Sequence, residues 1–211
     1  MGLIGRIRRI NARGFTLVEV LVALGIFSLL ALAVSWILIT ALRSNRIIWD
    51  QLSGQSDARR VLREVVDTAR RAEVSSLGAY PVERADPYEF IFYANVNTDS
   101  FRERVRFFVD QAANTINKGI TKPVDLPLRY ATSTEVVTVL ARDVVNDDLS
   151  IPVFSYFDES YTGSSTPLSA PVSTTLVHVI KVDLEIEHDP VATPVPLRAE
   201  STVMIRNLKT N

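Results

Sequence analysis

Residues 13–19 read Arg13-Gly14-Phe15-Thr16-Leu17-Val18-Glu19, and they open a long apolar run. From Phe15 to Leu42 there are 42 − 14 = 28 residues, which include one charged residue, Glu19, and no proline. A helix needs about 20 apolar residues to cross a bilayer, and 28 helical residues extend for about 42 Å. The run therefore predicts one membrane-spanning helix.

Glu19 is an unusual residue in such a helix, because a carboxylate at the centre of a bilayer costs up to about 3 kcal/mol. A carboxylate in this segment is expected to have a partner or a function. Four arginines, at positions 6, 8, 9 and 13, and no acidic residue precede the run. Basic residues before a first membrane helix keep that end in the cytoplasm, so we expect the chain after Leu42 to face outward.

The order of a basic leader, Gly14, Phe15, and Glu19 five residues after the glycine resembles the type IV prepilin signature. In that family a dedicated peptidase cuts after the glycine, and the new aromatic N-terminus is methylated. The resemblance implies cleavage between Gly14 and Phe15, N-methylation of Phe15, and pairing of Glu19 with a subunit amine that sets the register of packed helices. The alternatives are an ordinary signal-anchor helix and a cleaved secretory signal, whose apolar core would be shorter.

The resemblance also divides the chain into three parts. Residues 1–14 would be the leader, and residues 15–42 the transmembrane or filament-core helix. Residues 43–211 would be an exported domain, with an amphipathic helix at 43–76 followed by β-rich sequence at 82–211.

Apolar residues recur every three or four positions between Ile48 and Ala69, which predicts that the helix continues to about Ser76 with one buried stripe. Arg63–Asp67 and Asp67–Arg71 have the i,i+4 spacing of ion pairs on the other faces. Gly54 is the weak point of this helix, where it could bend or where the domain begins. Gly78 and Pro81 are the expected stop signals.

The sequence after Pro81 predicts strands with no convincing helix between them, so an antiparallel sheet is the default. The expected strands are residues 88–94, 104–109, 115–120, 134–140, 153–157, 175–186 and 201–208. Residues 159–173 and 188–196 are expected to be loops, the second one a long hairpin connection.

Three later segments, residues 139–144, 152–158 and 201–208, look like the corresponding parts of minor pilins of the J/W type. The resemblance therefore implies the pilin fold, of the α+β class. In this fold the second half of a long N-terminal helix packs across an antiparallel sheet.

Composition excludes several classes of function. Without the four leader arginines the chain has 23 − 4 = 19 basic and 24 acidic residues, and a formal charge near 19 − 24 = −5. This charge argues against a generally basic nucleic-acid-binding domain. Cysteine is absent, so no disulfide, thiolate metal site or cysteine nucleophile is available. Because the chain also has no glycine-rich phosphate loop and no GxSxG elbow, we expect neither a cofactor nor enzyme activity.

The remaining candidate residues favour structural interpretations. His178 is expected to be a core histidine on an apolar strand face, and His188-Asp189 a solvated turn, so no metal site is expected. Asp147-Asp148 and Asp158-Glu159 could contribute to a calcium site, but their spacing does not match an EF-hand loop. The arginines at 59–71 alternate with acids, which is typical of a solvated helix face rather than a DNA-binding stripe.

The leading hypothesis is a structural and assembly role, as a minor pilin or pseudopilin of a type IV pilus-like or type II secretion-like filament. Its partners would be other pilin subunits, prepilin peptidase, the inner-membrane assembly platform and, before assembly, membrane lipid. Such a chain is a single-pass membrane protein with a cytoplasmic N-terminus, and later part of a periplasmic or extracellular filament. One alternative is a tip adhesin or DNA-uptake module on the same anchor; another is a signal-anchored envelope protein unrelated to filaments. Pilus, secretion pseudopilus and competence system all remain open.

Overall fold

The computed structural model describes residues 14–97, 100–189 and 195–208. Within these residues the chain forms one α-helix, α1 (Leu17–Ala69), and ten strands that pair only in antiparallel fashion. The predicted α+β class is confirmed. The chain divides into two compact units, Met1–Arg46 and Ile47–Asn211.

The first unit contains the apolar part of α1, which by length and composition is able to span a membrane. Its large apolar side chains between Phe15 and Leu42 are 47–86 % exposed. Two of its hydroxyls are satisfied inside the helix, since Ser28 Oγ donates to the carbonyl oxygen of Leu24 (2.8 Å) and Thr40 Oγ1 to that of Trp36 (2.9 Å). A helix with this surface requires lipid or other apolar helices around it.

A five-stranded sheet forms the larger β-structure of the second unit. Its order is β1-β2-β3-β4-β7. The strands are β1 (Val82–Asp86), β2 (Glu89–Ala94), β3 (Glu103–Asp110), β4 (Thr115–Thr121) and β7 (Val136–Arg142). Phe90 and Phe92 on β2 and Phe107 on β3 are fully buried on the face that meets the helix. The strands predicted at residues 88–94 and 104–109 are therefore present as β2 and β3.

A second, three-stranded sheet has the order β10-β9-β8 and consists of β8 (Phe154–Phe157), β9 (Val179–Ile186) and β10 (Leu197–Met204). The antiparallel pairing that the sequence predicts is confirmed, and the strands are divided between separate sheets rather than joined in one. The backbone leaves the first sheet at Asp143, whose φ of 58° is left-handed, and Val144 bridges to Ile186 of the second sheet. The small elements are a β5–β6 pair (Pro123–Val124 and Arg129–Tyr130) and three 3-10 helices, η1 (Thr132–Thr134), η2 (Thr174–Leu176) and η3 (Arg206–Leu208).

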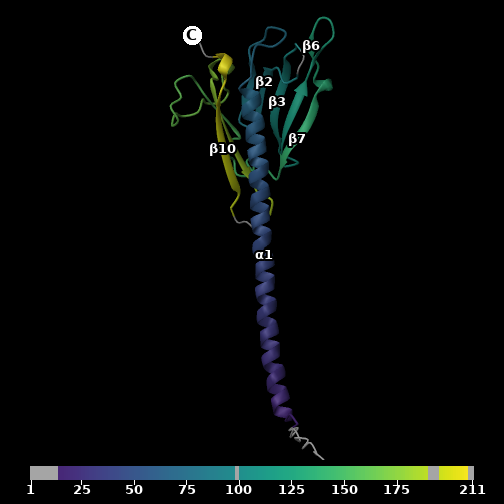
Figure 1. The fold of residues 1–211 in the computed structure, drawn as a ribbon. Coiled ribbons are helices and arrows are strands. Elements are labelled where there is room, and N and C mark those ends of the chain that lie inside the picture. The colour runs from purple at the N-terminus through teal and green to yellow at the C-terminus, as the bar shows by residue number, and fades with distance from the viewer. Residues whose placement is uncertain (1–13, 98–99, 190–194, 209–211) are drawn as a thin grey trace, which may run out of the picture. The chain divides into compact units, whose positions relative to one another are not determined.

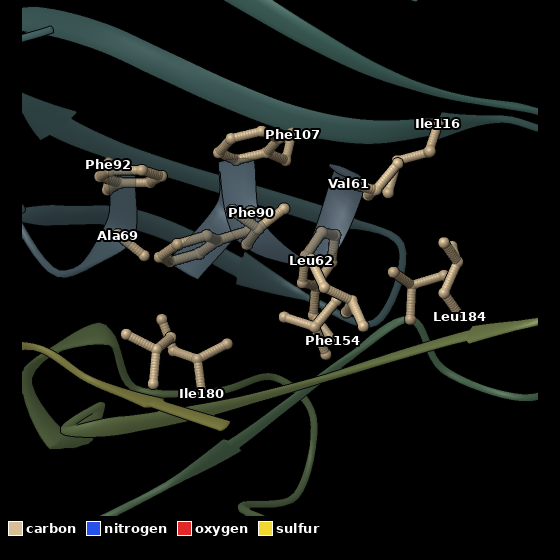
Figure 2. Packing of buried hydrophobic residues seen from close by; sticks show 14 of the residues in the cluster. Val61, Leu62, Ala69, Phe90, Phe92, Phe107, Ile116, Phe154, Ile180 and Leu184 are labelled. Atoms are coloured by element: carbon tan, nitrogen blue, oxygen red, sulfur yellow. The ribbon is translucent and has the colours of Figure 1, made fainter. Parts of the chain in front are cut away.

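One core joins the C-terminal part of α1 to both sheets. Figure 1 shows β10 on one side of the helix and β2, β3 and β7 on the other. Figure 2 shows Val61 and Leu62 of the helix between Phe107 of the five-stranded sheet and Phe154 of the three-stranded sheet. Burial of these side chains from water, at about 25 cal/mol per Å² of apolar surface, holds the three layers together.

Helix α1 ends at Ala69, seven residues before the predicted end at Ser76. The amides of Arg71 and Ala72 bond to carbonyl oxygens three residues earlier, which tightens the last turn. Ala72 then bridges to Ala94, and the amide of Glu73 donates to the carbonyl oxygen of Tyr93. The chain leaves the helix because hydrogen bonds to β2 replace those of another helical turn.

Several strand boundaries also differ from the prediction. The segment predicted at 175–186 is a strand only from Val179, because residues 174–176 form η2. The last strand is Leu197–Met204 rather than 201–208, and it pairs with β9 from Ile186↔Leu197 to Val179↔Met204. The predicted hairpin between these strands is confirmed.

Candidate functional site

The Gly14–Phe15 peptide bond precedes α1, outside regular secondary structure. Among the residues that the structure describes, no atom lies within 4 Å of a side chain built at Gly14, and Phe15 is 86 % exposed. The described residues therefore leave this bond uncovered. Residues 1–13 of the proposed leader lie outside the described residues.

Glu19 reaches back to the first residue before the helix. Its Oε2 accepts hydrogen bonds from the backbone amide (2.8 Å) and the hydroxyl (3.0 Å) of Thr16, and its own amide donates to Thr16 Oγ1 (3.3 Å). This reciprocal arrangement is a capping box, which satisfies amide groups that have no partner inside the helix. A carboxylate in the first helical turn also interacts favourably with the helix dipole.

The capping box is a role of Glu19 that the sequence analysis missed. Thr16-Leu17-Val18-Glu19 has the required T-x-x-E spacing at the start of an apolar run, so the signal was present in the sequence. In the capping box, the Glu19 carboxylate accepts hydrogen bonds from uncharged donors, the amide and the hydroxyl of Thr16. In the described part of the chain, no cation forms an ion pair with the Glu19 carboxylate.

Comparison with known proteins agrees with this geometry. A family model described as the prokaryotic N-terminal methylation motif matches residues 9–35, a segment that contains Gly14, Phe15 and Glu19. The chain is type IV prepilin-like. A search of curated proteins found no match.

The prepilin-like motif carries general consequences for the chain. It is a motif of structural subunits rather than enzymes, and of substrates of prepilin peptidase. Its general partners are that peptidase and other pilin subunits. Together with the exposed apolar helix, the motif supports membrane anchoring of this chain.

The two histidines lie in environments that differ from the prediction. His178 precedes β9 rather than lying within it, and its Nδ1 is 3.1 Å from the carbonyl oxygen of Leu176. His188 is not in a solvated turn, because its Nδ1 is 2.6 Å from Asp143 Oδ2 and its side chain is only 22 % exposed. The imidazole lies against the helix backbone at Gly54, next to a cavity of about 220 Å³.

One member of each acidic pair accepts hydrogen bonds from nearby side chains or backbone. Asp147 Oδ1 accepts from Gln111 Nε2 (2.7 Å), and Asp158 Oδ1 accepts from the hydroxyl and the amide of Ser160. The Ser160 hydrogen bonds lower the pKa of the Asp158 carboxyl. Among residues 14–97, 100–189 and 195–208, no three His, Asp or Glu side chains come together as metal ligands.

Proposed function

We propose that this chain is a minor pilin or pseudopilin, processed between Gly14 and Phe15, methylated at Phe15 and then incorporated into a type IV pilus-like or type II secretion-like filament. The observation that carries the proposal is the capped carboxylate of Glu19 at the start of a fully exposed apolar helix. A helix that is apolar on all sides needs an apolar environment, and packed helices in a filament core supply one after the chain leaves the bilayer.

The proposal assigns a role to each part of the chain. Residues 1–14 form the cytoplasmic leader, and residues 15–42 first cross the inner membrane and then line the filament. Residues 43–211 form the exported domain, which lies outside the membrane before assembly and on the filament after it. The assembly platform of the inner membrane would move the subunit from one state to the other.

Cleavage changes the electrostatics around Glu19. In the uncut chain the nitrogen of Phe15 is a peptide amide, whereas in the cut chain it is a charged amine. A charged amine of a neighbouring subunit can pair with Glu19, and such a pair is stronger than the neutral hydrogen bonds of the cap because the surroundings are apolar. Assembly would then exchange the Thr16 cap for an ion pair between subunits.

The test is substitution Glu19→Gln, which keeps the shape of the side chain and its ability to accept a hydrogen bond but removes the charge. The variant should insert in the membrane and be cleaved, because the scissile bond lies four residues away. Its amount in sheared filaments should fall by at least about tenfold, the loss of roughly 1.4 kcal/mol of interaction. Filaments would be isolated from cells with the complete assembly system, and the subunit quantified by immunoblot.

Asp148→Asn is the matched control, since Asp148 is an exposed carboxylate in a loop of the domain. This control variant should enter filaments at the wild-type level. Wild-type recovery of the Glu19→Gln variant would show that the charge does not select this subunit, and the proposed role of Glu19 would be wrong.

A further inference from the structure

A cavity of about 220 Å³ lies within the second unit, between α1 and the β9–β10 hairpin. Asp50 and Gln51 of α1 line one side of it, and His188 and Val195 of the hairpin line the other. Val195 is 75 % exposed, so the cavity has an opening to solvent. One water molecule needs only about 10–15 Å³ of such space, so the cavity has room for a small hydrated ligand.

Two side chains that line this cavity carry buried polar atoms without a partner. Asp50 Oδ2 and His188 Nε2 are covered from solvent, and neither has a hydrogen-bond partner among residues 14–97, 100–189 and 195–208. In that part of the chain only one other side-chain atom, Thr121 Oγ1, is in the same condition. Because a buried polar group without a partner is costly, two of them at one cavity indicate a missing ligand.

The Asp143 carboxylate determines which nitrogen of His188 carries the proton. His188 Nδ1 lies 2.6 Å from Asp143 Oδ2. A carboxylate oxygen accepts hydrogen bonds, so Nδ1 is the donor, and Nε2 of the neutral ring presents a lone pair. Nε2 and Asp50 Oδ2 are then both acceptors and cannot bond to each other. A cation would satisfy both atoms at once.

Helix α1 places Asp50 close to the imidazole. Asp50 and Gly54 are four residues apart and therefore lie on one face of the helix. A Cβ atom at Gly54 would lie 3.6 Å from His188 Nε2, so the glycine brings the helix backbone close to the ring. Gln51 adds a side-chain amide oxygen to the lining of the cavity. The helix and the hairpin thus present an imidazole nitrogen and side-chain oxygens to one cavity.

A metal ion suits this environment better than water does. No water-sized molecule reaches Asp50 Oδ2 or His188 Nε2 as they lie. A water molecule would need about 2.7–3.2 Å to each atom, whereas Zn²⁺ binds imidazole nitrogen and carboxylate oxygen at about 2.0–2.2 Å. The surroundings are also acidic, with Asp50 and Asp143 on two sides of the ring. Among the described residues, no lysine or arginine lines the cavity to neutralise them.

We propose that His188 Nε2 and the Asp50 carboxylate bind a divalent transition-metal ion of the zinc type, with Asp143 as the positioning residue behind the imidazole. A carboxylate that accepts from the second nitrogen of a ligating histidine is the usual arrangement at zinc sites. Two protein ligands leave coordination positions for Gln51 Oε1 and water. The imidazole ligand favours zinc-type ions over calcium, which prefers oxygen ligands alone.

The bound ion would link α1 to the β9–β10 hairpin and stabilise the domain, because it binds the folded state and its two ligands come from distant parts of the chain. This inference does not depend on the proposed filament role.

The first experiment measures zinc affinity. The full-length chain, purified in detergent micelles without a histidine tag and stripped with EDTA, is titrated with ZnCl₂ in competition with a chromophoric zinc indicator. One equivalent should bind, and an excess of CaCl₂ should not displace it. His188→Gln and Asp50→Asn should each weaken the affinity by at least about tenfold, since each removes a ligand. Asp143→Asn should weaken it by about tenfold to a hundredfold through the orientation of the ring, and Asp143→Glu should restore part of the loss.

His178→Gln is the matched control, because His178 is the other histidine of the chain. Its zinc affinity should equal that of the wild type. Circular dichroism in EDTA checks that each variant is folded. Zinc at about a hundredfold excess over its dissociation constant should raise the midpoint of thermal unfolding of the wild type by about 5 °C. The midpoint of Asp50→Asn should not change.

X-ray absorption at the zinc edge of the loaded wild-type chain decides the question even if a variant fails to fold. A first shell of one imidazole with oxygen ligands is expected, and His178→Gln should give the same spectrum. Absence of zinc binding, a shell without imidazole, or equal affinity of His188→Gln and the wild type would overturn the inference. Equally tight calcium binding would also overturn it. A stability that depends on His188 and pH in EDTA, without zinc binding, would show that the site takes a proton instead.

Discussion

Gly54 of α1 lies against Leu197 and His188 of the β9–β10 hairpin. A Cβ atom at this position would lie 3.4 Å from Leu197 Cδ2 and 3.5 Å from His188 Cδ2. These are ordinary contact distances, so one methyl group fits and a larger side chain does not. The predicted junction at Gly54 is in fact a packing position, two residues before the exposed Ser56 and four before the buried Ala58.

Gly54→Ala should stabilise the domain by about 0.5–1 kcal/mol, because alanine is the better helix former and needs no rearrangement. Gly54→Leu should destabilise the domain, because it would displace the His188 imidazole from Asp143. Urea denaturation of both variants, monitored by circular dichroism, gives the free energies of unfolding. A destabilising alanine would mean that Leu197 and His188 pack more tightly on the helix than the structure has them.

For single residues, the sequence predicts contacts between near neighbours in the chain better than contacts between residues that are far apart in the sequence. The hydrogen bond of Ser28 to the carbonyl oxygen of Leu24, for example, needs only a spacing of four residues within one helix. The partner of His188 is Asp143, 45 residues away in the sequence. The pair forms because the backbone leaves the first sheet at Asp143 and bridges to the second sheet at Val144, and no local sequence pattern encodes that crossing.

At the scale of elements, a polar cluster connects three strands of the five-stranded sheet on the face away from the helix. Glu83 of β1 accepts two hydrogen bonds of 2.8 Å from Arg104 of β3 and one of 2.6 Å from the hydroxyl of Tyr93 on β2. Burial raises the pKa of the Glu83 carboxyl, but hydrogen bonds from Arg104 and Tyr93 outweigh burial and hold that pKa below its ordinary value of 4.5. Burial and the Glu83 bond raise the pKa of Tyr93.

Glu83→Gln should reduce the free energy of unfolding by roughly 1 kcal/mol at pH 7, with allowance for the partial exposure of the cluster. The folded-state pKa of Glu83 is depressed, so its contribution is present above the unfolded value and is lost as pH falls through the folded value. The difference between variant and wild type should therefore shrink below pH 4.5. Urea denaturation at a series of pH values measures it, with Glu159→Gln in an exposed loop as control. A difference independent of pH would contradict the assignment.

The sequence predicted helices and strands correctly where the residues of one segment favour a structure by themselves, without help from a distant strand. Residues 89–94 and 103–110 are rich in strong strand formers, and both are strands. Strand β1 was missed because Val82–Asp86 contains three charged residues in five, and it forms by pairing with β2. The end of α1 was placed too late for a similar reason, since the competing hydrogen bonds come from β2, more than twenty residues later.

For the whole molecule, two features indicate the class of protein: the motif at residues 9–35 and the exposed apolar helix that follows Gly14. Both features can be recognised in the sequence alone. The division of the β-structure into two sheets around α1 could not be predicted from the sequence, because the strands of both sheets have similar apolar faces. Only the completed core, in which α1 contacts Phe107 and Phe154 from opposite sides, distinguishes one sheet from two (Figure 2). The proposed division into leader, filament helix and exported domain depends on processing after Gly14.

The mass of the N-terminal peptide tests that processing most directly. The chain would be purified from membranes of cells that contain prepilin peptidase, digested, and analysed by tandem mass spectrometry, alongside a Gly14→Val variant. We expect a wild-type chain that begins at methylated Phe15 and a variant that keeps residues 1–14, because a side chain at position 14 would block the peptidase. A wild-type chain that retains its leader, or that begins at any residue other than Phe15, would show that the proposed processing is wrong.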